Sequence, residues 1–189
     1  MARPRSEDKR QTILQAATRL FAEEGLTAPT SRIAKAAGVA EGTVFTYFIS
    51  KDELMNQLYS DLKAQLRLAY ADIPDSTELR ESIWQYWSAY VTWGLTHPVE
   101  RQALARLQVS GRITSATRSA AAQSFQNIVD LLIEAMRLGG LRHQPPAFIG
   151  ALMVAMAETA IDFIGNNPAL AKNTCADAFS AFWNAITTC

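Results

Sequence analysis

Apolar side chains recur at helical spacing along nearly the whole chain, and no stretch shows the strict alternation of apolar and polar residues that is typical of a strand. The few Gly and Pro residues fall between these periodic stretches, where helices are expected to end. The pattern therefore predicts an all-α fold of about nine helices. The expected ranges are 6–24, 31–37, 41–48, 51–70, 78–96, 99–109, 115–138, 146–165 and 169–186.

The predicted helices fall into a compact head of three, a linking fourth helix and five helices behind it. A turn signal at Pro74 and Asp75 separates the linking helix from the last five. We therefore expect an N-terminal domain over 1–50, a linking helix over 51–72 and a C-terminal domain over 73–189. The composition, 49% hydrophobic and 19% charged, is that of a globular protein with a sizeable core.

The stretch from Thr30 to Lys51, TSRIAKAAGVAEGTVFTYFISK, predicts two short helices around a glycine turn. Thr30 is the expected N-cap of the first helix, Gly38 permits the tight turn between the two, and Ser50 is the expected N-cap of the helix that follows. In the second helix Val44 and Phe48 lie four residues apart and are expected to point inward. This spacing predicts a helix-turn-helix.

The outer face of the second short helix is expected to carry Thr43, Thr46 and Tyr47, which lie at positions i, i+3 and i+4. This face is short, polar and without negative charge, so it suits contact with phosphates and base edges in a major groove. The second helix is therefore predicted to be the reading helix.

The charge distribution also points to an anionic partner at the N-terminus. Residues 1–51 hold eight Lys or Arg and five Asp or Glu, whereas the remaining residues hold ten and thirteen. A basic head on an acidic body is typical of chains that bind a polyanion, although chance gives the same imbalance. Four basic residues near the start form either an arm that reaches a groove or a frayed charged terminus. They are Arg3, Arg5, Lys9 and Arg10.

At these residues the chain resembles the TetR family of bacterial regulators. Four blocks appear in the family's order and spacing within roughly the first sixty residues. They are ILQAATRLFAEEG at Ile13 to Gly25, IAKAAGV at Ile33 to Val39, GTVFTYF at Gly42 to Phe48 and SKDEL at Ser50 to Leu54. The resemblance implies a DNA-binding head followed by a divergent domain for ligand binding and dimerisation.

The resemblance also implies roles for single residues of the head. Helix 41–48 contacts bases or phosphates, Lys51 pairs with a phosphate beside the start of the next helix, and helix 31–37 touches the DNA backbone. Solvated charges at Arg32 and Lys51, and a core aromatic at Tyr47, are the alternatives. The implied DNA-binding set is Thr30, Arg32, Gly42, Thr43, Thr46, Tyr47 and Lys51.

Two residues depart from the family pattern. Phe45 stands where the family often has Tyr, so one phosphate hydrogen bond is missing. Ala40 stands where a Ser-type N-cap is common, and an alanine there costs about 0.5–2 kcal/mol of helix stability. Glu41 offsets this slightly through the helix dipole, but a carboxylate sits poorly beside phosphates.

The C-terminal part has no motif of comparable specificity. Aromatic side chains surround much of helix 78–96, and they either line an apolar pocket or pack in the core. With the resemblance, they indicate a small apolar or aromatic effector. The predicted ligand-binding residues are Trp84, Trp87, Tyr90, Val91, Arg106, Phe125 and Met153.

The last two helices are interpreted as a dimer interface. Helix 146–165 is apolar and rich in small residues, and in the family the corresponding helices pair with their copies around a twofold axis. Two reading helices about 34–36 Å apart would then bind a palindromic operator. The alternative is that both helices close the monomer's own core. The predicted interface residues are Gly150, Ala151, Val154, Glu158, Phe179, Phe182, Trp183 and Ile186.

Other functional classes find little support in the sequence. It contains no nucleophile elbow, no His or Cys cluster with metal-ligand spacing and no phosphate-binding glycine loop, so we expect neither an enzyme nor a cofactor. Cys175 and Cys189 cannot bridge within one helix, which favours a reducing cytoplasm; their redox role stays open. The longest apolar run, Pro145 to Ala157, is shorter than the roughly 20 residues of a membrane span.

The sequence therefore predicts a homodimeric regulator, in the family's commoner mode a repressor, that leaves DNA when an effector binds. The alternative is a module of the same fold that binds small molecules or proteins but not DNA. The operator, the effector and the choice between repressor and activator stay open.

Overall fold

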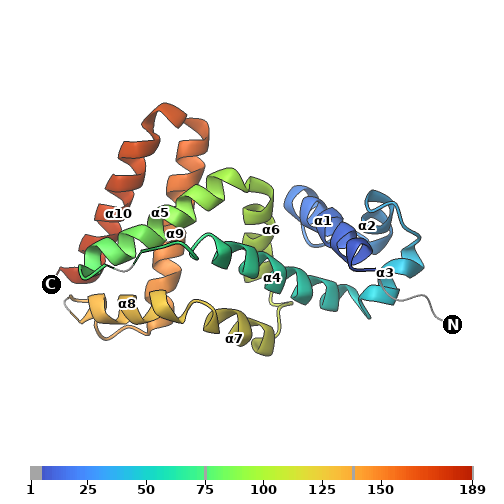
Figure 1. Ribbon diagram of the computed structural model, residues 1–189, viewed down its shortest axis with the longest axis horizontal. Coiled ribbons are helices and arrows are strands. Elements are labelled where there is room, and N and C mark those ends of the chain that lie inside the picture. The colour runs from blue at the N-terminus through green and yellow to red at the C-terminus, as the bar shows by residue number, and fades with distance from the viewer. Residues whose placement is uncertain (1–5, 75, 138, 189) are drawn as a thin grey trace. The chain divides into compact units, whose positions relative to one another are not determined.

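The computed structural model describes residues 6–74, 76–137 and 139–188. This part of the chain is all-helical, as predicted, and contains no strand (Figure 1). Arg3 and Arg5 of the predicted arm, Asp75 of the predicted turn and Cys189 lie outside the described residues. The helices are α1 Glu7–Glu24, α2 Thr30–Ala36, α3 Glu41–Tyr47, α4 Lys51–Leu68, α5 Leu79–Thr96, α6 Pro98–Val109, α7 Ser115–Gln123, α8 Gln126–Met136, α9 Pro146–Asn166 and α10 Ala171–Thr187, with a 3₁₀ turn at Pro168–Leu170.

The stretch predicted as one helix over 115–138 forms two helices, α7 and α8, so the described chain has ten helices instead of nine. The amide of Phe125 bonds to the carbonyl of Ala122 at 2.9 Å, and this tighter i→i−3 bond ends α7. The Phe125 ring then packs edge-on against Tyr70, with 5.8 Å between ring centroids. Because the break contains neither Gly nor Pro, local sequence rules do not predict it.

Contacts group the helices into two units. One combines residues up to 65 with 97–121, and the other combines 66–96 with 122–189. The chain passes from one unit to the other within α4, between α5 and α6, and within α7. The boundaries of these two units differ from the expected division of the chain at residues 50 and 73. The functional division of the chain stays a prediction.

The first unit is built around α1, which packs against both α2 and α6. The apolar stripe of this helix is buried, and Phe21 at its end is fully enclosed. Because α1 contacts both partners through this apolar stripe, it fixes where the short α2 lies. The largest enclosed side chains of the unit are Ile13, Leu14, Phe21, Ile33, Phe48, Leu54, Leu58 and Leu62.

Lys63 is a half-buried cation of this unit. The ammonium of Lys63 lies 5.8 Å from the centre of the Tyr59 ring. Burial lowers the pKa of Lys63 to about 8, and the nearby guanidinium of Arg118 adds to the effect. The cation therefore lies in a low-polarity environment, where it gains from the face of the aromatic ring.

The second unit is built around α9 and α5, with α10 and α8 packed against them. At its centre the Trp87 ring stacks on Phe182 at 5.8 Å and meets Phe179 at 5.7 Å. Gly139 allows the chain to pass close to the end of α10, because a Cβ there would lie 2.3 Å from the carbonyl oxygen of Ile186. An alanine at Gly139 would thus require the backbone to shift.

Helix α9 agrees with the predicted helix 146–165 to within one residue, but it is more apolar over its length than the run from Pro145 to Ala157 suggests. It runs 21 residues without interruption, with a mean hydropathy of 1.8 over its most apolar stretch, of which a third is buried. By length and composition alone it could cross a membrane, so the argument that its apolar run is too short was wrong. Core helices of globular proteins have the same length and composition, so this finding is weak evidence for a membrane span.

Candidate functional site

Helix α2 ends in a hydrogen-bonded glycine turn that sets the direction of α3. Gly38 has a φ of +67°, in the left-handed region that glycine adopts without strain. The amide of Val39 bonds to the carbonyl of Ala34 at 3.0 Å, and that of Gly38 to Lys35 at 3.2 Å. These two bonds form a Schellman motif, which satisfies the last carbonyls of α2 and begins the turn.

Two side chains hold α3 against the first unit. Val44 is 1% exposed and Phe48 is fully enclosed, as predicted from their spacing. The opposite side of the helix carries Gly42 and Thr46, both exposed, with Thr43 half-buried between the two sides. The structure therefore presents a short polar surface on α3, arranged as a helix-turn-helix requires.

Three of the predicted DNA-binding side chains already form a hydrogen bond or an ion pair with a residue outside their own helix. The hydroxyl of Thr30 donates to the Glu41 carboxylate at 2.8 Å. The Arg32 guanidinium pairs with Glu24 on α1. The third, the Tyr47 hydroxyl, accepts a hydrogen bond of 3.0 Å from the backbone amide of residue 6. Each contact to phosphate would therefore replace or share an internal contact.

Two predictions about helix caps have different outcomes. Thr30 was expected to cap α2 but is its first residue, because the extended backbone of Pro29 precedes it and its hydroxyl bonds to Glu41 instead. Ala40 precedes α3 and provides no side-chain cap, as predicted. Only the backbone bond from the Thr43 amide to the Ala40 carbonyl, at 2.8 Å, closes the first turn.

Lys51 begins α4, directly after its N-cap. The hydroxyl of Ser50 accepts a hydrogen bond from the Glu53 amide at 3.1 Å, which confirms the predicted cap. The ammonium of Lys51 lies 5.9 Å from the Phe21 ring centre. Burial, followed by the charge of Arg112, lowers the pKa of Lys51, while neighbouring Asp52 opposes the change.

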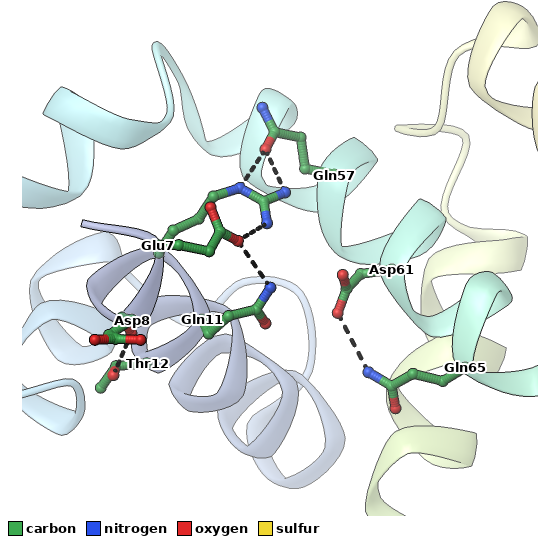
Figure 2. A network of polar contacts seen from close by, with 8 residues as sticks. Glu7, Asp8, Gln11, Thr12, Gln57, Asp61 and Gln65 are labelled. Atoms are coloured by element: carbon green, nitrogen blue, oxygen red, sulfur yellow. Dashed lines mark hydrogen bonds and ion pairs between the residues drawn. The ribbon is translucent and has the colours of Figure 1, made fainter. Parts of the chain in front are cut away.

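Polar side chains fix α4 against its neighbours in the first unit. Arg10 on α1 donates two hydrogen bonds to the Gln57 side-chain oxygen, at 3.0 and 3.3 Å. Figure 2 shows Gln57 close to Glu7, the first residue of α1. The Asn56 side chain donates to the carbonyl of Arg112 at 3.0 Å and accepts from the amide of Thr114 at 2.9 Å. These bonds connect α4, and with it Lys51, to α1 and to the segment after α6.

The part of the chain that contains the helix-turn-helix is similar to known proteins. A family model described as bacterial regulatory proteins of the tetR family matches residues 13–58. The HTH-type transcriptional repressor KstR2 of Mycobacterium tuberculosis is 40% identical over 70 residues, which is 36% of this chain and 35% of that repressor. The chain thus spans about a third of the length of this curated relative.

Solved structures match over the whole length. A TetR-family transcription regulator from Shewanella sp. PV-4 superposes with a TM-score of 0.82 and 26% identity, covering 95% of this chain and 97% of that one. Residues 13–58 of the chain match the TetR family, and the chain as a whole has the fold of TetR-family regulators. A second structure, FadR from Bacillus subtilis in complex with stearoyl-CoA, has a TM-score of 0.65 and 20% identity over 90% of this chain and 98% of that one, and it shows the likeness of fold.

The predicted ligand-binding residues do not all lie in one unit. Six of the seven belong to the second unit, but Arg106 lies on α6 in the first unit, with its guanidinium against Gly25. Trp87 and Val91 are enclosed in the aromatic core, where Trp87 contacts two phenylalanines. Packing therefore accounts for Trp87, and its predicted role in ligand binding stays a prediction. The members of the second unit are Trp84, Trp87, Tyr90, Val91, Phe125 and Met153.

A cavity of about 340 Å³ lies in the second unit beside α5 and α8. Its described lining includes Gln85, Tyr86 and Leu131, and none of the predicted ligand-binding residues. The side-chain oxygen of Gln85, one of the lining residues, is buried and has no hydrogen-bond partner among the described residues. The sequence did not predict this lining, because a single glutamine such as Gln85 in an aromatic helix gives no indication that it borders a cavity.

The predicted dimer residues divide between the core and the surface. Phe179, Phe182 and Ile186 are enclosed within the second unit, so their side chains fill its own core. The Glu158 carboxylate accepts a hydrogen bond of 2.6 Å from the Tyr90 hydroxyl inside the same unit. A single chain does not test their contact with a second copy. The other four are exposed or half-buried: Gly150, Ala151, Val154 and Trp183.

Two further features concern chemistry. Burial raises the pKa of the half-buried Cys175 thiol, and the Trp87 indole beside it opposes this change. A raised pKa leaves less of the reactive thiolate at neutral pH. Within residues 6–74, 76–137 and 139–188, no group of three or more His, Cys, Asp or Glu side chains could hold a metal ion.

The pair between Arg32 and Glu24 gives a prediction about DNA affinity. Glu24→Gln should tighten DNA binding about two- to fivefold for each chain that contacts the DNA, because an exposed ion pair that competes with phosphate is worth at most about 1 kcal/mol. Glu23→Gln is the matched control, since it removes the same charge from the neighbouring position on α1. Fluorescence anisotropy at one fixed salt concentration measures both variants. Equal affinities for the two would show that the pair does not compete with DNA.

Proposed function

We propose that this chain is a transcriptional regulator that binds a palindromic DNA operator as a homodimer, through the helix-turn-helix of α2 and α3. It acts as a repressor in the cytoplasm and leaves the operator when a small apolar or aromatic effector binds the second unit. The observation that carries this proposal is α3 itself, which is held by Val44 and Phe48 with its polar side chains facing away from them.

The chemistry of α3 favours DNA as the partner. Short hydroxyl side chains at Thr43 and Thr46 allow a helix to lie deep in a major groove and to reach bases or phosphates. Lys51 at the start of α4 adds a cation beside free backbone amides, which together favour a phosphate. The relative KstR2 is named as a repressor, which supports the same mode here.

Helix α9 supports the proposed dimer. Phe148 and Phe163 are exposed large apolar side chains near its two ends, and Ala151 and Ala155 are exposed between them. Small residues along one face let a second helix approach closely, and an apolar face left in water favours such a partner. A second copy of α9 gives an isologous contact that closes with two chains.

The cavity beside Gln85 is the proposed effector site. Its wall combines apolar residues such as Ile73 and Leu131 with polar ones such as Gln85, so it suits a ligand that has both an apolar part and a well-placed hydrogen-bond donor. The FadR structure holds stearoyl-CoA, and this makes acyl-CoA thioesters a first class to test, with part of the apolar acyl chain in the cavity and the CoA moiety outside it. The effector acts by binding the DNA-free conformation better than the DNA-bound one, since a ligand shifts an equilibrium only through such a difference.

DNA binding is tested with a random-sequence library from which the full-length protein selects its preferred site. The selected DNA should contain two inverted half-sites. Thr46→Ala should weaken binding to it about 10- to 30-fold, because the dimer loses two hydrogen bonds of about 1 kcal/mol each. Fluorescence anisotropy with the selected duplex measures the loss.

The control for this variant is Thr12→Ala. Both hydroxyls bond to the carbonyl four residues earlier, at 3.1 Å for Thr46 and 2.7 Å for Thr12, but Thr12 lies on α1. Equal losses for the two variants would assign the effect to helix stability. Binding to selected DNA no tighter than to random DNA would favour the alternative of a module that does not bind DNA.

The dimer is tested by sedimentation equilibrium. The wild-type protein should sediment at twice the chain mass of 20.8 kDa, and Ala151→Glu should give monomers because it places a charge and extra volume on the proposed contact. Ala122→Glu makes the same change at an exposed position on α7 and should stay dimeric. A dimer that survives Ala151→Glu would exclude the α9 face as its interface.

The effector site is tested with stearoyl-CoA as the first probe. If this ligand lowers operator affinity by some factor, operator DNA must lower its affinity by the same factor. Gln85→Leu should weaken the ligand about fivefold by removing the acceptor, while the exposed Gln123→Leu should not. Intrinsic tryptophan fluorescence follows ligand binding. A ligand that binds without changing operator affinity would contradict the proposed release.

A further inference from the structure

Phe45 is an exposed aromatic residue on the proposed reading helix. It follows the buried Val44 directly and is 45% exposed, although phenylalanine is usually enclosed. The surface on its Gly42 side is open, because a Cβ at Gly42 would meet nothing within 4 Å. A flat object that approaches α3 at this point therefore reaches the ring without a steric barrier.

The chemistry of this ring decides what it can contact. A phenyl ring has no hydrogen-bond donor or acceptor, so it cannot bind a phosphate oxygen or a polar base edge. The major groove presents one apolar group, the C5 methyl of thymine. A hydrophobic side chain among short polar neighbours on a groove-facing helix is therefore matched to that methyl.

We propose that Phe45 is a specificity-determining residue that recognises a thymine in each half-site by packing its ring against the C5 methyl. This inference rests on the proposed binding of DNA through α3. A tyrosine at this position would be expected to form a hydrogen bond to a phosphate. Phenylalanine lacks that bond and instead makes a contact that distinguishes one base from the other three.

One neighbour offers the same kind of surface and serves as a control. Ile49 is 87% exposed, but it lies after the end of α3, and its amide bonds to the Glu53 carboxylate in the turn before α4. It is apolar and close in sequence, but it is not part of the reading helix. If the contact to the thymine methyl comes from the face of α3, Ile49→Ala should leave that contact unchanged.

The experiment uses the full-length protein and the duplex selected from the random library. Each thymine is replaced in turn by deoxyuridine, which keeps every hydrogen-bonding group and removes only the methyl. At one thymine per half-site the wild-type protein should lose about fourfold in affinity, the effect of one buried methyl group. With Phe45→Ala the same replacement should have no effect, whereas Phe45→Tyr and Ile49→Ala should retain it.

Three results would overturn the inference. They are selected half-sites without a fixed thymine, wild-type affinity that no deoxyuridine changes, and a methyl effect that persists in Phe45→Ala. Circular dichroism checks that this variant is folded, and Phe45→Gln replaces it if it is not, because glutamine favours a helix and also lacks the ring. The comparison is a ratio of affinities within one variant, so a general weakening of binding does not affect it.

The outcome separates this inference from the proposed function. Selection of a palindromic site with no effect of deoxyuridine retains the DNA-binding regulator and removes only the role of Phe45. Failure to select any site removes both.

Discussion

The burial of Val44 and Phe48 is the interaction on which the proposed interface depends. An isolated helix of seven residues is not stable in water, since nucleation costs more than so few hydrogen bonds return. Helix α3 also begins without a side-chain cap. Its helical form and its orientation therefore rest on these two enclosed side chains and on the turn at Gly38 that leads into it.

The polar groups around α3 are organised before any DNA is present. Thr30, Arg32 and Tyr47 each have an internal partner, and two of those partners are carboxylates. Such contacts hold side chains near the surface where phosphates would lie, which lowers the entropy cost of binding. The same carboxylates compete with phosphate, so affinity for DNA without the right sequence is reduced. Specificity then depends more on the contacts that α3 makes with bases.

The head could be predicted from the sequence because its signals are local. The spacing of Val44 and Phe48, the glycine at the turn and Ser50 before α4 each act within a few residues, and the structure agrees with all three. Thr30 is the exception: its hydroxyl bonds to Glu41, eleven positions away, and a cap rule cannot foresee such a contact.

The second unit could be predicted much less well. Periodicity shows that a side chain is buried but not which surface buries it, so Phe179 and Phe182 were equally compatible with a dimer interface and with the core around Trp87. At the break before α8, Phe125 packs against Tyr70, which is distant in sequence. The packing of 97–121 with the head likewise joins segments that are distant in sequence.

The salt dependence of binding to the selected duplex tests the central claim most directly. If the first unit binds phosphates, the logarithm of the binding constant falls linearly with the logarithm of salt concentration, with a slope of about −0.9 for each phosphate contact. Lys51→Gln should then reduce the magnitude of the slope by about 1.8, for one contact in each chain of a dimer. A slope near zero, or one that this substitution leaves unchanged while affinity falls, would contradict the placement of Lys51 at a phosphate and with it the proposed interface.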